Sequence, residues 1–287
     1  MIRYGELCLR IRHDLRDADG EEAGKTAREL VAFAAGKTRE ELARDRDLYV
    51  AEPVIRKTEE LTKEYLAGKP LPYLLGEWSF YGLTLTVTPE VLIPRDDTMV
   101  VTALAMEILK DLPQPRVLDL CAGSGCIGLA IAHHLPRTRV TLAELSDDAI
   151  RVARENVTRC RLASRVTVVK ADALTDPPAY LKNYDVLVSN PPYIRRSEIG
   201  TLTPSVRDHE PRMALDGGED GLVFYRAICR NYAPVLRDHG VICLEFGIGQ
   251  QDAVKEILTE NHFTDAVFCR DASEILRAVM AWKNGKE

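Results

Sequence analysis

The stretch RVLDLCAGSGC, residues 116–126, is an apolar run that ends in a turn of small residues. The run is typical of a buried strand, and the apolar segment after the turn, residues 127–135, is long enough to form a helix. Small residues let a ligand approach the backbone, and the first turn of the helix offers free N–H groups. Because a strand, a turn and a helix form the repeating unit of parallel sheets, this stretch predicts an α/β fold.

The same alternation continues to the end of the chain. Further strands are predicted at 139–143, 165–170, 184–189, 240–246, 263–269 and 275–281, with helices over 225–236 and through 257–258. The last two strands are expected to pair antiparallel. The repeated units predict an open, mostly parallel sheet, with ligands at the carboxyl ends of its strands.

The residues before position 76 follow a different pattern. Apolar residues at positions 7, 11 and 15 recur at helical spacing, and similar spacing continues to about position 73. Residues 78–87 then alternate around Gly82, which predicts a β-hairpin. We therefore expect an N-terminal helical domain at 1–75 that docks the substrate, a hairpin linker at 76–97 and a catalytic domain at 98–287. A stabilising cap is the alternative role for the helical domain.

Composition indicates a globular protein rather than a nucleic-acid coat or a membrane protein. The 287 residues are 46% hydrophobic and 29% charged, with a net charge of −6 that disfavours wholesale binding to nucleic acid. The seven cysteines form no CxxC pair, which favours reduced thiols in a cytoplasmic protein. We expect no metal site, no membrane partner and no direct nucleic-acid partner, since the N-terminus lacks an apolar signal segment and no stretch reaches the length of a membrane span.

The predicted strand 184–189 runs directly into Asn190-Pro191-Pro192-Tyr193. The prolines restrict φ at two successive positions, so the Asn190 side chain and the Pro191 carbonyl are candidates for two converging acceptors beside the Tyr193 ring. Two acceptors beside a flat ring suit a planar NH2 group, and gripping both N–H groups would favour attack of its nitrogen on an electrophilic methyl. The alternative is a Pro-rich corner in which Asn190 only forms a turn.

Two other strand ends carry carboxylates that suit a nucleoside. Glu144 follows the strand at 139–143, at the separation from the small-residue turn where Rossmann-like folds place a ribose-binding acid. Asp172 follows the strand at 165–170 and is a candidate acceptor for an adenine amino group, or a plain strand-end Asp. The turn at 121–125 lacks the full G-x-G-x-x-G that cradles a pyrophosphate, so S-adenosylmethionine fits better than a dinucleotide.

Two residues near the start of the helix expected after position 97, Thr98 and Arg95, are candidates for structural roles. Thr98 is expected to cap that helix. Arg95, between an extended run and the helix, is a candidate partner for an acidic group or a carbonyl, with a plain surface charge as the alternative. Glu210, Asp216 and Glu245 are interpreted as turn and cap residues rather than as an acid–base set.

These motifs resemble a known family. DLCAGSG at 119–125, Glu144 and SNPPYI at 189–194 are similar to class I S-adenosylmethionine-dependent methyltransferases acting on planar nitrogens. PYLLGEWSFYG at 72–82, VLIPR at 91–95 and EPRMALDGGEDGL at 210–222 further resemble the release factor-specific protein-(glutamine-N5) methyltransferases of the PrmC/HemK type.

The resemblance implies a Rossmann-like domain with a mostly parallel seven-stranded sheet, preceded by a small helical domain and a hairpin. It implies methylation of the glutamine amide in the Gly-Gly-Gln motif of peptide-chain release factors, in the cytoplasm. The residues implied for the methionine part of the cofactor are Cys121, Ala122, Gly123, Ser124 and Gly125; those for its ribose and adenine are Glu144, Asp172 and Ala173; and those for the glutamine amide are Asn190, Pro191, Pro192 and Tyr193.

The chain departs from the family pattern at several positions. The family usually has Gly at 121 and Asp at 144; Cys121 can still offer its backbone if its φ stays negative, and Glu144 is one methylene longer, so both departures are tolerable. Ala173 replaces a frequent aromatic residue, and RDDTM at 95–99 replaces the usual Arg-Pro-Glu-Thr-Glu.

Three alternatives remain beside glutamine methylation of a release factor. One is a nucleic-acid N-methyltransferase acting on adenine N6 or guanine N2, which the net negative charge of the chain disfavours. Another is glutamine methylation of a different protein, such as a ribosomal protein. The third is a non-catalytic scaffold that only binds the cofactor.

Overall fold

The computed structural model describes residues 1–284 of the chain. Contacts between residues divide it into two compact units: Met1–Gly76 with Pro204–His209, and Glu77–Thr203 with the residues from Glu210 onward. The hairpin therefore belongs to the second unit.

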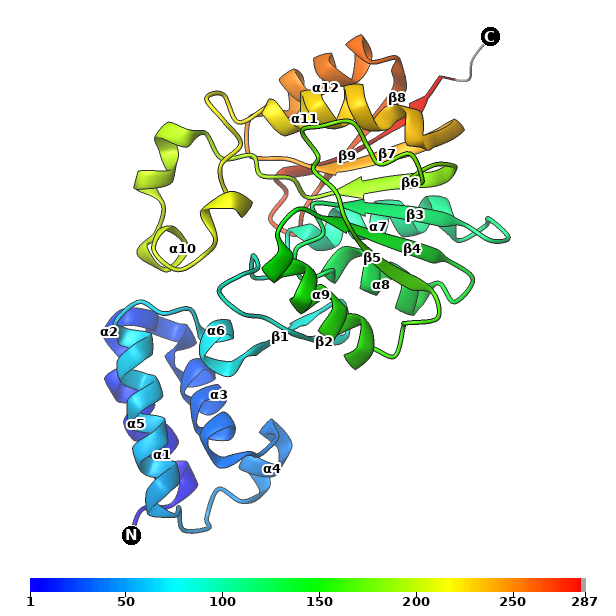
Figure 1. Ribbon diagram of the computed structural model, residues 1–287. Helices are drawn as coiled ribbons and strands as arrows, with labels where there is room; N and C mark the ends of the chain where they lie inside the picture. The colour runs from blue at the N-terminus through cyan, green and yellow to red at the C-terminus, as the bar shows by residue number, and fades with distance from the viewer. Residues whose placement is uncertain (285–287) are drawn as a thin grey trace. The chain divides into compact units, whose positions relative to one another are not determined.

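The first unit is helical (Figure 1). Its helices are α1 (Tyr4–Asp14), α2 (Arg16–Asp19), α3 (Ala23–Ala35), α4 (Arg39–Arg44), α5 (Glu52–Leu66) and α6 (Leu71–Leu75), and α10 (Pro204–Arg207) joins them from later in the chain. Helix α3 packs against α1 and α5, and Leu7, Ile11 and Leu15 are fully buried as their spacing predicts. Thr38 accepts a hydrogen bond from the Glu41 N–H, which begins α4 with a capping box.

The second unit contains a seven-stranded sheet in the order β5-β4-β3-β6-β7-β9-β8. Its strands are β3 (Arg116–Leu120), β4 (Arg139–Glu144), β5 (Val166–Lys170), β6 (Tyr184–Ser189), β7 (Leu236–Glu245), β8 (Phe263–Arg270) and β9 (Leu276–Lys283). The first five are mutually parallel, while β9 pairs antiparallel with β7 and β8. The predicted α/β class, the mostly parallel sheet and the antiparallel terminal pair are confirmed.

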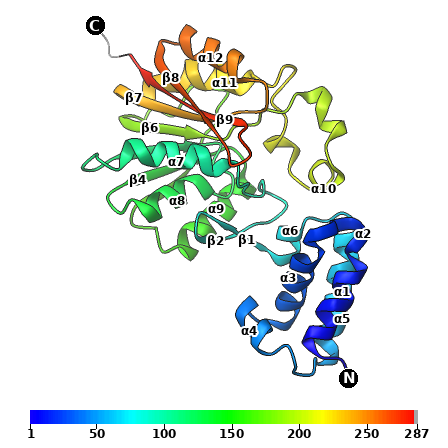
Figure 2. The same ribbon diagram turned by 180° about the vertical axis from the view of Figure 1, so that it is seen from behind.

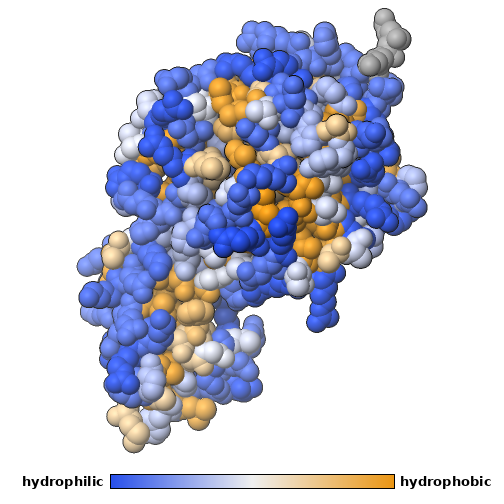
Figure 3. Space-filling view, viewed as in Figure 1, coloured by the Kyte–Doolittle hydropathy of each residue, from blue (hydrophilic) through white to orange (hydrophobic). Residues whose placement is uncertain are grey.

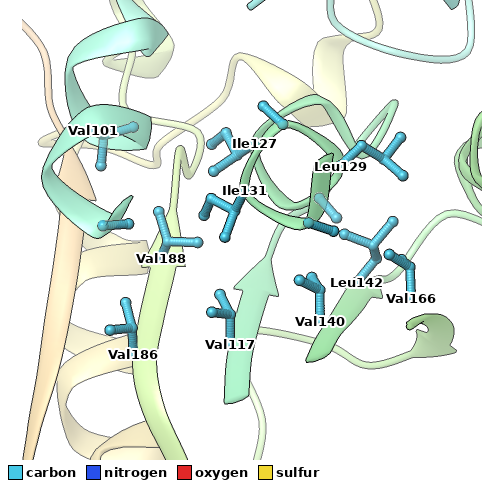
Figure 4. Close-up of a cluster of buried hydrophobic side chains, with 14 of the residues drawn as sticks. Val101, Val117, Ile127, Leu129, Ile131, Val140, Leu142, Val166, Val186 and Val188 are labelled. Atoms are coloured by element: carbon cyan, nitrogen blue, oxygen red, sulfur yellow. The ribbon is translucent and has the colours of Figure 1, made fainter. Parts of the chain in front are cut away.

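Helices cover both faces of this sheet (Figures 1 and 2). Helices α7 (Thr98–Leu109), α8 (Cys126–His134) and α9 (Asp147–Arg159) cover one face, and α11 (Val223–Ala227) and α12 (Gln251–Glu260) cover the other. Figure 4 shows Val117, Val140 and Val186 pointing from the strands toward α7 and α8. Leu118 and Leu187, one position along their strands, face the opposite layer, as the period of two requires.

One predicted helix differs from the structure. Instead of a continuous helix over 225–236, α11 ends at Ala227, a π-helical turn follows at Ile228–Tyr232, and a short 3₁₀ turn at Ala233–Val235 leads into β7 at Leu236. Pro234 lacks a backbone N–H and disfavours a continuing α-helix. The apolar residues that suggested the helix are buried all the same, among them Tyr232.

The predicted β-hairpin consists of β1 (Glu77–Phe80) and β2 (Leu83–Thr86). Asn156 on α9 binds the hairpin through its side-chain amide. Its Oδ1 accepts from the Thr86 N–H at 2.7 Å, and its Nδ2 donates to the Thr86 and Ser124 carbonyls at 3.0 Å each. The fully buried Asn156 therefore connects the hairpin to the turn at 121–125.

The face shown in Figure 3 is predominantly hydrophilic, and hydrophobic residues gather in areas on both units. Within residues 1–284, no helix has the length and apolar character needed to span a membrane.

We predict that Asn156→Ala lowers the free energy of unfolding by about 2–3 kcal/mol, because it leaves buried backbone groups of Thr86 and Ser124 without partners. Urea unfolding measures this change. Arg154→Ala, on the exposed side of the same helix, is the matched control. Equal stability of the two variants would contradict the role of Asn156.

Candidate active site

A cavity of about 300 Å³ lies at the carboxyl ends of β3, β4, β5 and β6. In the sheet, β3 lies between β4 and β6. After β3 the chain forms β4 and β5 on one side of it, and then crosses over to form β6 and β7 on the other side. Crevices at such a reversal of strand order are the usual ligand sites of open α/β sheets. The lining includes Cys121, Ala122, Gly123, Ser124, Glu144, Asp172, Ala173, Asn190 and Pro192. Gly125, Pro191 and Tyr193 are also predicted site residues, but they do not line this cavity.

The turn after β3 presents its backbone to the cavity. Cys121 has a φ of 60°, so the condition of a negative φ is not met. A non-glycine residue in this left-handed conformation is strained by roughly 1–2 kcal/mol, a cost that a glycine at this position would avoid. The thiol is chemically quiet, because burial raises the pKa of Cys121 well above its usual range.

Glu144 is a nearly buried carboxylate at the end of β4. Its Oε2 accepts from the Gly123 N–H at 2.9 Å, and its Oε1 accepts from the N–H groups of Leu145 and Ser146 at 2.8 and 2.9 Å. A carboxylate has about four acceptor positions, so three are occupied by the protein and about one remains for a ligand. The longer Glu side chain thus joins the turn after β3 to the loop after β4.

Asp172 follows β5 and also has free acceptor capacity. One of its carboxylate oxygens accepts from the Leu174 N–H at 2.8 Å, and Tyr232 donates to its backbone carbonyl at 2.8 Å. The neighbouring Ala173 is buried and offers no ring for stacking. Phe224 from α11 brings an aromatic side chain to the cavity lining instead.

Asn190 lies at the end of β6, and its Nδ2 donates to the Thr98 hydroxyl at 3.1 Å. Thr98 is the first residue of α7, and Asp97 occupies the N-cap position without a side-chain cap bond. The expectation that Thr98 caps the helix is therefore wrong, since its hydroxyl is bonded to Asn190. Sequence analysis missed this contact because the two residues are 92 positions apart.

The backbone after Asn190 is enclosed by the glycine-rich segment at 215–221. The Ile194 N–H donates to the Leu215 carbonyl at 3.0 Å, and the Gly217 N–H donates to the Ile194 carbonyl at 2.8 Å. A Cβ at Gly217 would lie 2.8 Å from the Tyr193 backbone, and a Cβ at Gly221 would lie 2.5 Å from the Tyr193 carbonyl oxygen. The glycines are required because the two backbones touch.

Gln250 completes the enclosure from the loop after β7. Its Nε2 donates to the carbonyls of Tyr193 and Gly221 at 3.0 and 3.3 Å, and its Oε1 accepts from the Gly247 N–H at 2.9 Å. One amide therefore connects three loops.

Arg95, which lines the cavity, forms an ion pair with the buried Glu210. The surface-charge alternative for Arg95 is thus wrong. Burial raises the pKa of Glu210 and the Arg95 guanidinium opposes that shift. The pair joins the two sequence stretches at 91–95 and 210–222.

The unusual stretch at 95–99 keeps its essential contacts. Asp97 pairs with Arg277 on β9 at 3.2 Å, and Met99 packs against the hydrophobic core. Thr98, between them, retains the contact with Asn190.

Two buried carboxyls lie near the carboxyl ends of β3 and β7. Burial raises the pKa of Asp119 on β3 and of Glu245 on β7 to about 7 each. Asp119 accepts from the Gly128 N–H in the first turn of α8 at 2.8 Å. Glu245 accepts from the Tyr193 hydroxyl at 3.5 Å, so the expected turn or cap role for Glu245 is wrong. Asp216 does stabilise a turn, by accepting from the Gly218 N–H at 3.0 Å.

The cavity therefore combines free acceptors at adjacent strand ends with apolar walls. Among residues 1–284, no cluster of His, Cys, Asp and Glu has the arrangement of a metal site. The arrangement suits binding of a neutral or cationic nucleoside beside a planar NH2 group.

Comparisons with known proteins agree with this arrangement. The model of the methyltransferase small domain matches residues 95–229, and that of the PrmC N-terminal domain matches residues 6–76. The release factor glutamine methyltransferase of Clostridium acetobutylicum is 33% identical over 284 residues, covering 99% of this chain and 100% of that one. The protein of the same name from Moorella thermoacetica is 46% identical over 191 residues, covering 67% and 66%.

The solved hMettl16 catalytic domain, in complex with a 3'UTR hairpin, superposes with a TM-score of 0.56 at 18% identity, covering 88% of this chain and 90% of that one. At this identity the likeness shows the methyltransferase fold alone.

We predict that Gly221→Ala lowers turnover roughly 100-fold while leaving cofactor affinity nearly unchanged, because the new Cβ displaces the Tyr193 carbonyl and with it the Asn190 loop. Gly82→Ala is the control, since Gly82 has a similar positive φ and an added Cβ there would meet no neighbour. Kinetics with saturating cofactor separate the two variants. Equal turnover in both would rule out crowding at Tyr193 as the cause.

We also predict that Glu144→Ala weakens binding of S-adenosylhomocysteine by roughly 10–100-fold, because a charge-assisted hydrogen bond and three loop contacts are lost. Isothermal titration calorimetry measures the affinity, with the exposed Glu256→Ala as control. Unchanged affinity in Glu144→Ala would exclude this carboxylate from the cofactor site.

Proposed function

This chain belongs to the release factor glutamine methyltransferase family, and we propose that it transfers a methyl group to the side-chain amide nitrogen of a glutamine in a peptide-chain release factor. The target is the glutamine of the Gly-Gly-Gln motif. The observation that carries the proposal is that Glu144 and Asn190, the predicted cofactor and amide contacts, line one cavity.

The residues of the cavity fit S-adenosylmethionine. Glu144 keeps an acceptor position for a ribose hydroxyl, Asp172 keeps one for the adenine amino group, and the turn at 121–125 offers its backbone to the methionine part. When bound, this cofactor supplies an electrophilic methyl on a sulfonium sulfur. The lining contains no cluster of cations for a pyrophosphate, as expected for a nucleoside without phosphate groups.

The Asn190 loop orients the nucleophile. The Asn190 Oδ1 and the Pro191 carbonyl accept the two N–H groups of the glutamine amide, so that its nitrogen points at the methyl group. An amide nitrogen is a weak nucleophile because its lone pair is delocalised, and acceptors that bind more tightly as the nitrogen becomes pyramidal lower the barrier. The nitrogen loses one N–H proton to water after transfer, so a strong general base is unnecessary.

We further propose that three segments of the chain have different functions. Residues 1–75 dock the release factor, residues 76–97 form a linker, and residues 98–287 carry out the methyl transfer. The match of the PrmC N-terminal domain model to residues 6–76 supports a function shared with that family for the first unit. The net charge of −6 disfavours nucleic acid as the substrate.

Incubation with labelled S-adenosylmethionine and either a release factor or nucleic acid tests the function, with the methyl group located by mass spectrometry. We expect label on the glutamine of the Gly-Gly-Gln motif. Label confined to nucleic acid, or to a different protein, would replace the proposed substrate, and no label in any sample would favour a binding scaffold.

We predict that Asn190→Ala lowers turnover by roughly 10²–10³-fold, because it removes one of the two acceptors that hold the amide in the transition state. Affinity for S-adenosylhomocysteine should change far less. Single-turnover rates and calorimetry measure the two quantities, and retained turnover would show that Asn190 does not hold the amide.

A further inference from the structure

The loop after β5, residues 171–183, contains no helix or strand before β6 begins at Tyr184, yet it brings Asp172 and Ala173 to the cavity. A carboxylate recognises one base over another only if its free oxygen is held at a fixed place in the cavity. The loop therefore needs contacts that fix its position from outside.

Contacts within the loop shape its first turn. One Asp172 carboxylate oxygen accepts from the Leu174 N–H at 2.8 Å, which is an Asx-turn and leaves the other oxygen for a ligand. The Asp172 backbone carbonyl accepts from the Thr175 N–H and hydroxyl at 3.3 and 3.4 Å. Because these bonds join near neighbours, they define the shape of the turn but do not fix it to the rest of the protein.

Two side chains from a distant segment do fix it. The Tyr232 hydroxyl donates to the Asp172 backbone carbonyl at 2.8 Å, across 60 positions of sequence, and this is the shortest of the bonds to that carbonyl. The Asn231 Nδ2 donates to the Leu174 carbonyl at 3.2 Å. The two bonds hold the chain on either side of the buried Ala173.

Tyr232 and Asn231 reach the same loop because they belong to the π-helical turn at Ile228–Tyr232. A turn with i→i+5 hydrogen bonds contains more residues than an α-helical turn, so consecutive side chains diverge less. Tyr232 is fully buried and packs in the hydrophobic core, which fixes its ring. Burial also raises the pKa of Tyr232 above its usual range, so its hydroxyl keeps its proton and donates.

We propose that Tyr232 and Asn231 are positioning residues for base recognition, which hold the loop at 172–174 so that the free Asp172 carboxylate oxygen meets the amino group of adenine. The inference deepens the proposed function and rests on its assignment of S-adenosylmethionine as the cofactor. Neither Tyr232 nor Asn231 lines the cavity, so both act through Asp172.

This role predicts a loss of selectivity for the base rather than a general loss of affinity. If the carboxylate oxygen moves, the bond to the adenine amino group is lost. Glu144 and the turn at 121–125 keep their own hydrogen bonds and still hold the rest of the ligand. A variant of Tyr232 should therefore bind a ligand without the amino group as well as the wild type does.

The test measures binding to the full-length protein by isothermal titration calorimetry. The two ligands are S-adenosylhomocysteine and its 6-deamino analogue, in which a hydrogen replaces the adenine amino group. We expect the wild type to prefer S-adenosylhomocysteine by roughly 10–100-fold, as for a hydrogen bond to a charged group. In Tyr232→Phe this preference should fall to about threefold or less, with affinity for the analogue unchanged.

Asn231→Ala should lower the preference in part, and the double variant Asn231→Ala/Tyr232→Phe should abolish it. Asp172→Ala should abolish it as well. If Tyr232 acts through Asp172, adding Tyr232→Phe to Asp172→Ala should weaken binding of S-adenosylhomocysteine no further.

Tyr184→Phe is the matched control. Tyr184 is also a buried tyrosine, but it lies at the start of β6, and its hydroxyl donates to the Thr141 hydroxyl at 3.0 Å. This variant should keep the wild-type preference.

An undiminished preference in Tyr232→Phe would overturn the proposal, and so would equal weakening of both ligands, which would indicate a general structural role. Full weakening by Tyr232→Phe in the Asp172→Ala background, or a wild type without any preference, would also overturn it. Should Tyr232→Phe fail to fold, Asn231→Ala decides the question, because an undiminished preference there refutes the role of the π-helical turn.

These measurements are independent of the methyl acceptor. If the wild type methylates no release factor, the proposed substrate is wrong, while the preference for S-adenosylhomocysteine over its analogue still decides whether Tyr232 and Asn231 position Asp172.

Discussion

The Tyr193 backbone has no space around it for a side chain on its neighbours, and the active site depends on this close contact. Gly217 and Gly221 lie against it, and Gln250 binds its carbonyl while also binding Gly221 and Gly247. These close contacts and hydrogen bonds fix the position of a loop that has no regular secondary structure. In the proposed reaction a rigid loop matters, because acceptors that orient a weak nucleophile are effective only if they are in place before the substrate binds.

The same principle explains the buried carboxylates at the strand ends. Glu144 is occupied by three backbone N–H groups and joins two loops, Glu210 is paired with Arg95, and Glu245 accepts from the Tyr193 hydroxyl. Each burial costs solvation free energy, which hydrogen bonds or an ion pair offset only in part. The raised pKa of Glu245 is the sign of this incomplete compensation, since its Oε2 atom is buried without a hydrogen-bond partner.

Where sequence analysis was wrong, the cause was a contact between distant residues. Thr98 looked like a helix cap because Thr before an apolar helix often has that role, but Asn190, 92 residues away, binds its hydroxyl instead. The sequence left the φ of Cys121 open; in the structure it is 60°, and the next residue, Ala122, donates its N–H to the Ala143 carbonyl of β4 at 3.2 Å. Glu245 was interpreted as a turn or cap residue, although it lies in the apolar run of the predicted strand 240–246, and the structure buries it at the end of β7.

The amino-acid sequence by itself determined the α/β class, the helical N-terminal region, the hairpin and the strand ends that bear the site, because periodicity and turn residues are local properties of a chain. It also indicated Glu144 and Asn190, since a motif places them at the end of a strand whatever lies beside that strand. Only the tertiary structure decided which acceptors remain free at Glu144, why glycines surround Tyr193, and how the buried Glu245 comes to lie beside the Tyr193 hydroxyl. Those properties depend on hydrogen bonds and close contacts between segments far apart in the chain, and a local pattern carries no information about which partner will satisfy a buried polar group.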